Sequence, residues 1–220
     1  VRSFMGDHAM KVGIDALWSS FAGTSSSGTV EIRRGDGTLA ERLTFDGASA
    51  QTGQSTDVGA FLQDRWRMTD RVIGEWGVRV DRDGVTGARS VSPRAGFVVS
   101  LVPDSRAVIR GGVGRFVGRT PLMAGAFPSL EGYTAQSFER DGEVPVGASA
   151  RVVYSIAEAL RPASARVWNV EYDQKMGESL SFKVNHLERD GWHELVVEPR
   201  GDGTERTIDL TSSGHSTYRE

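Results

Sequence analysis

The stretch RVIGEWGVRVDRD, residues 71–83, decides the fold of this chain. Its side chains alternate in character with a period of two residues. The even positions are apolar or small, namely Val72, Gly74, Trp76, Val78 and Val80, and the odd positions include Arg71, Glu75, Arg79, Asp81 and Asp83. Because successive side chains of a β-strand point to opposite faces, the pattern predicts a strand with one apolar and one charged face.

The same alternation recurs along the chain, whereas helical periodicity is nearly missing. The alternating runs predict about eight long strands, at residues 8–21, 58–68, 71–83, 93–101, 107–117, 168–172, 180–184 and 204–219. Three residues break the pattern, because Asp64 falls on the apolar side of its strand and Arg115 and Phe116 interrupt the run at 107–117. The sequence therefore predicts an antiparallel all-β protein.

The connections between these strands alternate in length. Short turns with hairpin-favouring residues stand at 6–7, 69–70, 103–105 and 177–178. Long polar segments stand at 20–56, 82–90, 119–163 and 189–205. The first long segment contains a predicted hairpin of its own, residues 30–34 with 39–45. The third is expected to be a glycine- and proline-rich loop with at most one helical turn, at 156–160.

Composition excludes several classes of protein. The 220 residues hold 26 basic and 29 acidic side chains, so no global positive field exists to bind nucleic acid. No apolar run is long enough for a membrane-spanning helix, and the chain has no cysteine. Its four histidines are scattered without metal-ligand spacing. No catalytic motif has a supporting context, so the sequence predicts no enzyme, no metal and no cofactor.

Two architectures fit the alternation. A soluble β-sandwich buries the apolar faces in a core, but its strands average five or six residues, and its connections are not sorted by length. A transmembrane β-barrel has strands of about 9–11 residues, short turns on one side and long loops on the other. Four of the five tryptophans, together with Tyr172, fall on the apolar side, as in an aromatic girdle; these four are Trp18, Trp66, Trp76 and Trp168.

Five motifs, in order, resemble those of TonB-dependent outer-membrane receptors. AFLQDRWRMTDR at 60–71 is similar to that family's FxQDxWRxTDR hairpin, and GVRVD at 77–81 is similar to its GxRxD strand end. SPRAG at 92–96, RGGVGRF at 110–116 and HAMKVG at 8–13 resemble further strand edges. The resemblance covers about residues 6–120 and, more loosely, 167–186. The most similar subgroup carries a carboxypeptidase-like regulatory domain.

The resemblance implies an antiparallel up-and-down transmembrane β-barrel with short periplasmic turns and long extracellular loops. Such receptors have roughly 22 strands around a plug domain, so residues 1–220 are expected to be an incomplete barrel, with the plug and the remaining strands absent. The implied function is uptake of an unknown external ligand, driven by the TonB system through the plug, in a barrel surrounded by outer-membrane lipid. The implied location is the outer membrane of a Gram-negative cell.

The resemblance also gives roles to particular residues. Side chains on the polar face are expected to line the lumen and contact the plug: Gln63, Arg65, Glu75, Arg79, Asp81, Arg94 and Arg110. The long loops at 23–54 and 119–163 are expected to contact the ligand, with Phe127, Tyr133 and Phe138 as apolar contacts. Two alternatives stay open, a complete eight-stranded outer-membrane barrel with a structural or adhesive role and a soluble β-sandwich binding module.

Overall fold

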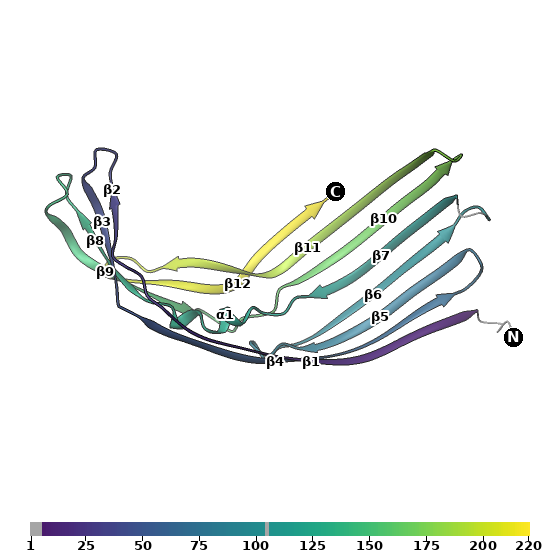
Figure 1. Ribbon diagram of the computed structural model, residues 1–220, viewed down its shortest axis with the longest axis horizontal. Helices are drawn as coiled ribbons and strands as arrows, with labels where there is room; N and C mark the ends of the chain where they lie inside the picture. The colour runs from purple at the N-terminus through teal and green to yellow at the C-terminus, as the bar shows by residue number, and fades with distance from the viewer. Residues whose placement is uncertain (1–5, 104–105) are drawn as a thin grey trace.

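The computed structural model describes residues 6–103 and 106–220 (Figure 1). Its twelve strands are β1 Asp7–Ser25, β2 Val30–Arg33, β3 Leu39–Phe45, β4 Ser49–Arg67, β5 Val72–Arg82, β6 Arg89–Ser100, β7 Ala107–Val117, β8 Tyr133–Phe138, β9 Pro145–Ile156, β10 Ser164–Met176, β11 Leu180–Arg200 and β12 Glu205–Arg219. A helical turn, α1 (Leu122–Gly125), and a 3₁₀ turn, η1 (Phe127–Ser129), lie between β7 and β8. No helix in the described ranges is long and apolar enough to span a membrane.

All twelve strands belong to one sheet, in the order β1-β4-β5-β6-β7-β10-β11-β12-β9-β8-β3-β2. The eight predicted runs become β1, β4, β5, β6, β7, β10, β11 and β12, and each pairs antiparallel with its neighbour. At the short turns that the structure describes in full, four residues, Met68–Arg71, connect β4 to β5, and three residues, Gly177–Ser179, connect β10 to β11. Asp104 and Ser105 of the predicted turn at 103–105 lie outside the described residues.

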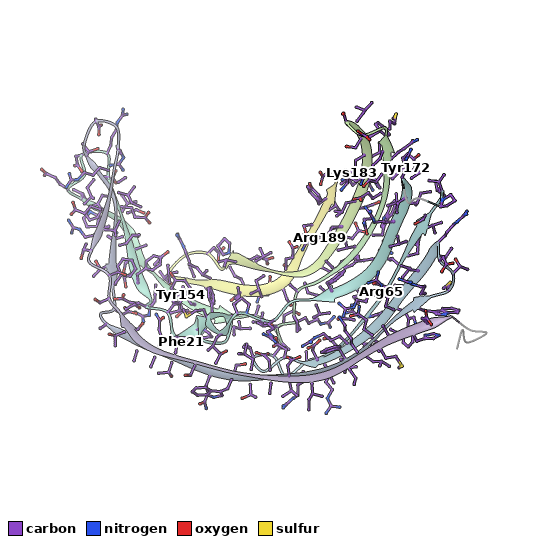
Figure 2. The ribbon with its side chains drawn as sticks, turned by 45° about the vertical axis from the view of Figure 1, so that its right-hand side comes forward. Phe21, Arg65, Tyr154, Tyr172, Lys183 and Arg189 are labelled. Carbon is purple, nitrogen blue, oxygen red and sulfur yellow. The ribbon has the colours of Figure 1, made fainter. Side chains whose placement is uncertain are left out.

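The sheet has two chemically different faces, as the alternation predicts. On the apolar face, which carries Val12, Ile14, Val80, Val113 and Phe182, side chains are 47–85% exposed. The polar face carries the charged residues of the same strands. In the described residues no large side chain is fully buried, because nothing packs against either face as a second layer would. Figure 2 shows side chains projecting from both sides of this one curved layer. The sandwich alternative is therefore wrong.

The sheet is also open. Strand β1 forms one edge, and β12 pairs with β11 and β9 but not with β1. Along β11, residues 180–186 have a strand partner on one side only within the described chain, because pairing with β12 and Glu220 begins at Leu187. A closed eight-stranded barrel is therefore excluded for these residues, and the sheet has the form of an incomplete barrel wall.

The long connections hold more structure than predicted. The hairpin at 30–34 and 39–45 forms as β2 and β3, but the segment 119–163 is not a loop, because it contains β8 and β9. The segment 189–205 is mostly strand as well, since β11 continues to Arg200. These strands were missed because residues such as YTAQSF, 133–138, show little apolar–polar contrast; hydrogen bonds to β3, β9 and β12 stabilise them instead.

Candidate functional site

Six of the seven predicted lumen residues lie in contact groups on the polar face of β4, β5 and β6. Gln63, Gly77 and Arg94 are directly opposite one another on these strands. The Arg94 guanidinium reaches across Gly77 and donates from Nη2 to Oε1 of Gln63 at 3.2 Å. A Cβ on Gly77 would lie 3.3 Å from Nε of Arg94 and 3.1 Å from the Leu62 carbonyl. Because Gly77 has no side chain, the Arg94 guanidinium can extend across β5 to Gln63.

A second arginine uses a glycine in the same way. Arg79 on β5 donates from Nε to both carboxylate oxygens of Asp81, at 2.8 and 3.0 Å, and its Nη2 lies 2.9 Å from Oδ1 of Asp15 on β1. Strand β4 runs between β1 and β5, and its residue at this level is Gly59. A Cβ there would lie 2.6 Å from Oδ1 of Asp81. Gly59 thus allows one ion-pair group to span three strands.

The other predicted residues of this face are paired as well. Arg65 lies 3.4 Å from Glu75, directly across β4 and β5. Arg110 on β7 lies 2.6 Å from Glu171 on β10, and Lys183 on β11 lies 2.8 Å from the other oxygen of the same carboxylate (Figure 2 labels Arg65 and Lys183). The structure therefore places all seven predicted residues on one face, but it divides them into separate groups rather than one site.

A cavity of about 420 Å³ lies where the polar face meets the long connections. Its wall carries four aspartates and three arginines, which are Asp15, Asp57, Asp81, Asp83, Arg79, Arg82 and Arg119. Arg119 lies 3.2 Å from Asp15, so the segment after β7 is held against β1. The cavity presents both signs of charge within hydrogen-bonding reach of one another and suits a polar ligand group.

Asp83, in the turn between β5 and β6, organises one end of this cavity. Its side chain is buried and accepts hydrogen bonds from the Thr86 and Thr120 backbone N–H groups, both at 2.8 Å, and from the Thr86 hydroxyl at 2.7 Å. Burial alone would raise the pKa of Asp83, but these donors favour the carboxylate and hold its pKa below the ordinary value of 3.8. A charged Asp83 thus joins the β5–β6 turn to the segment after β7.

The two long connections associate into one structure. Glu131 is buried and accepts backbone hydrogen bonds from Ser27 at 2.8 Å and Gly47 at 3.0 Å, which lie on either side of the β2–β3 hairpin. Asp46 and Arg151 form a two-pronged ion pair at 2.7 and 2.8 Å. The Arg34 guanidinium donates to the carbonyls of Leu39, Phe138 and Glu139. These contacts join residues far apart in the sequence, and no local sequence pattern predicts them.

The three predicted ligand-contacting aromatics lie in this region but do not form one patch. Phe127 packs edge-on against Tyr154, and Tyr133 packs against Phe45, with ring centroids 5.4 Å apart in both pairs. Phe138 lies beneath the Arg42 guanidinium and is only 9% exposed, which leaves little surface for a ligand. Phe127 and Tyr133 are half-buried and keep some accessible surface.

The histidines do not assemble a metal site. In the ranges 6–103 and 106–220, no group of three or more histidine or acidic side chains is arranged to hold a metal ion. His8 instead stacks on Trp66 and lies 2.7 Å from the carboxylate of Asp64. Asp64 is the residue that breaks the alternation of its strand. His8 provides a hydrogen-bond partner for its Oδ2 on the apolar face, whereas its buried Oδ1 has no hydrogen bond within the described residues.

Comparison with known proteins gives the family of this architecture. The model of the TonB dependent receptor-like β-barrel matches residues 4–193. The outer membrane transporter YddB from Escherichia coli is similar over 96% of this chain and 27% of its own, with a TM-score of 0.68 and 15% identity. The siderophore receptor PirA from Pseudomonas aeruginosa is similar over 99% of this chain and 43% of its own, with a TM-score of 0.54 and 10% identity.

These matches describe receptors and transporters rather than enzymes. A comparison with curated proteins found no match. The chain spans about a quarter of the YddB structure and less than half of the PirA structure. At 10–15% identity the two structures bear on the fold alone, whereas the family model covers most of the sequence. Two-faced strands, sorted connections and this match lead to one conclusion: the chain belongs to the TonB-dependent receptor β-barrel family.

Proposed function

We propose that this chain forms part of the wall of an outer-membrane receptor, which binds an external ligand and imports it with energy from the TonB system. The observation that carries the proposal is the division of one open sheet into an exposed apolar face and a polar face of paired charges. An apolar face of this size would be unstable in water but suits acyl chains. Within the proposal the apolar face meets lipid, and the polar face lines the lumen.

The length of the connections supports an orientation. The short turns would lie in the periplasm, and the sheet of β2, β3, β8 and β9 would stand outside the cell, at the opposite end in Figure 1. The polar-face residues Gln63, Arg65, Glu75, Arg79, Asp81, Arg94 and Arg110 are proposed to contact a plug domain through charge-assisted hydrogen bonds. Phe127, Tyr133 and the charged cavity are proposed to contact the ligand.

Neighbouring residues of β6 provide a matched test of the two faces. Val91 is 49% exposed on the apolar face, and Ser92, the next residue, lies on the polar face. These 220 residues have no cysteine, so once any cysteine elsewhere in the full-length receptor is replaced by serine, Val91→Cys and Ser92→Cys can each carry a bimane label in lipid vesicles. Doxyl-labelled lipid should quench the label at position 91 and leave the label at position 92 bright. Equal quenching at both positions would contradict the lipid-facing assignment.

Transport is tested separately in cells. Deletion of the receptor gene should abolish growth on one limiting nutrient among siderophore-bound iron, cobalamin, glycans and peptides, and loss of TonB should give the same defect. Complementation by the intact gene is the control. Uptake that requires the receptor but continues without TonB would contradict the energy source and leave the barrel assignment intact.

A further inference from the structure

The apolar face of the sheet changes character along β11. Next to the short turn, β11 carries Leu180, Phe182 and Val184 on this face, and these side chains are 47–60% exposed. Because side chains two residues apart point to the same side of a strand, Glu188 and Asp190 stand on this face as well. Two carboxylates therefore interrupt the face that the proposed function assigns to lipid.

Glu188 lies at a height that lipid would cover. It is directly opposite Trp168 on β10, which is directly opposite Val113 on β7. It is eight positions beyond Leu180, which is about 26 Å along a strand at about 3.3 Å per residue. With the tilt of about 40° that barrel strands have, this gives about 20 Å of height, and the apolar band of such barrels is about 25 Å tall. An ionisable group at this depth is costly unless something other than hydrocarbon covers it.

Each of the two carboxylates is paired with an arginine of a neighbouring strand. Asp190 lies 2.9 Å from Arg166 on β10. Glu188 lies 3.1 Å from Arg219 on β12 and accepts a hydrogen bond from the Trp168 indole N–H at 3.1 Å. The carboxylate side chains are 19% and 21% exposed, whereas the Arg166 and Arg219 side chains are 62% and 73% exposed. Because a guanidinium has five N–H donors, each arginine keeps donors for a second acceptor.

These four residues, Arg166, Glu188, Asp190 and Arg219, form the charged patch, and its signs alternate from strand to strand. The arginines stand on β10 and β12, and the carboxylates stand on β11 between them (Figure 1). An anionic lipid head would meet a carboxylate beside each arginine, and acyl chains would meet four charges. A protein surface with the same alternation, displaced by one strand, would instead place unlike charges against each other.

We propose that the charged patch is the centre of a homodimer interface within the membrane, formed with a second copy of this chain. Two receptors in one bilayer can be related by a two-fold axis along the membrane normal, which brings the same surface of both copies together. An axis between β10 and β11 sets β10 of each copy against β11 of the other. Arg166 then faces Asp190 of the second copy, and Trp168 faces Glu188 of the second copy.

Apolar side chains beside the charged patch supply the rest of this interface. Trp168 and Val170 on β10 are 37% and 39% exposed, and Val184 on β11 is 51% exposed. Tryptophan and arginine are among the residues that contribute most at the centres of protein interfaces. The interface rests on the proposed outer-membrane placement, because the two-fold axis requires both copies to have the same orientation in one bilayer.

The oligomeric state can be measured on the full-length receptor in detergent by light scattering, with the detergent mass subtracted. We expect the unchanged receptor to have twice the monomer mass. Arg166→Asp and Asp190→Arg should each weaken self-association at least about tenfold, because each variant sets like charges against one another between the copies. Heat-modifiable gel migration reports whether the barrel of each variant is folded.

An equimolar mixture of the two folded variants separates contacts between copies from contacts within one copy. In a mixed pair, the acidic position 166 of one copy faces the basic position 190 of the other, and the acidic position 190 faces the basic position 166. Complementary charges therefore return between the copies, whereas the charges within each copy stay alike. We expect the mixture to regain the dimer mass.

Arg140→Asp is the matched control, since it reverses one exposed arginine in the turn between β8 and β9, outside the charged patch. It should associate as the unchanged receptor does. A monomeric unchanged receptor, with or without bound lipid, would overturn the interface, and so would a folded Arg166→Asp variant that still dimerises or a mixture that stays monomeric. Fractionation of cells separates these outcomes from failure of the proposed function, because a receptor absent from the outer membrane would refute the placement itself.

Discussion

Replacement of Glu131 by alanine tests how the two long connections, residues 26–48 and 118–163, are held together. The carboxylate is 7% exposed, and it accepts hydrogen bonds from the Ser27 and Gly47 amides at 2.8 and 3.0 Å. Hydrogen bonds to a charged acceptor contribute about 1.5–3 kcal/mol each. Water replaces part of that loss near the surface, so we expect a local destabilisation of about 3 kcal/mol for the pair of bonds.

The assay is amide hydrogen exchange of the full-length receptor, followed by mass spectrometry. A loss of about 3 kcal/mol corresponds to about a hundredfold faster exchange at the two amides that Glu131 protects. The amides of Arg42 and Thr44 provide an internal reference, because they face β8 on the same side of β3 as the Asp46 amide, and the pairing of β3 with β8 does not involve the Glu131 side chain. Glu131→Gln keeps one acceptor oxygen and should fall between the unchanged receptor and the alanine variant.

Glu143→Ala is the external control, since Glu143 is an exposed glutamate in the turn between β8 and β9. It should leave exchange at Ser27 and Gly47 unchanged. The reasoning is refuted if Glu131→Ala leaves these two amides at their original exchange rates. It is also refuted if exchange accelerates equally across the whole sheet, because that result would report global unfolding rather than release of one contact.

Three further predictions concern other contacts. Because the folded pKa of Asp83 is lowered, its carboxylate stabilises the β5–β6 turn above pH 3.8, and this stabilisation is lost as the pH falls through the lower folded pKa. Cleavage of the turn by pepsin should therefore increase below pH 3.8. The Asp83→Asn variant should be cleaved at every acidic pH. Gly77→Val should displace Arg94 and lower the free energy of unfolding in vesicles by about 1 kcal/mol, as measured from urea midpoints. Gly23→Val is the control and should leave the free energy of unfolding nearly unchanged, because a Cβ at position 23 meets nothing within 4 Å. Arg34→Lys keeps the charge but loses the guanidinium fork that donates to three carbonyls, so amide exchange in the turns of the β2–β3 and β8–β9 hairpins should rise. Unchanged exchange would show that these hydrogen bonds do not stabilise the turns.

The sequence predicts the eight long strands well, because adjacent residues on their two faces differ sharply in polarity. All eight alternating runs, among them 71–83 and 204–219, correspond to strands. This contrast is weak in β8 and β9, so those residues were expected to be loop. There, hydrogen bonds between distant segments decide the structure, and a local pattern cannot report them.

The candidate site, too, could be predicted from the sequence only in part. Periodicity predicts correctly that Arg79 and Arg94 share a face, since that requires only the two-residue repeat of a strand. It does not give the register, which brings Gly59 and Gly77 opposite these arginines and lets them reach across a strand. The seven polar residues were therefore predicted as one set, whereas the structure separates them into local ion-pair groups.

The parallel pairing of β9 with β12 has a consequence for how a larger barrel is built. Through β3, β8 and β9, the Glu205–Leu210 half of β12 is hydrogen-bonded to the hairpin that connects β1 with β4, although seven steps of the wall separate β1 from β12. The two sides of the wall are therefore linked at the end that carries the long connections, while β1 and β2 remain the edges of the open sheet. Strands that join at β1 or β12 would meet two sides that are already joined to each other at this end.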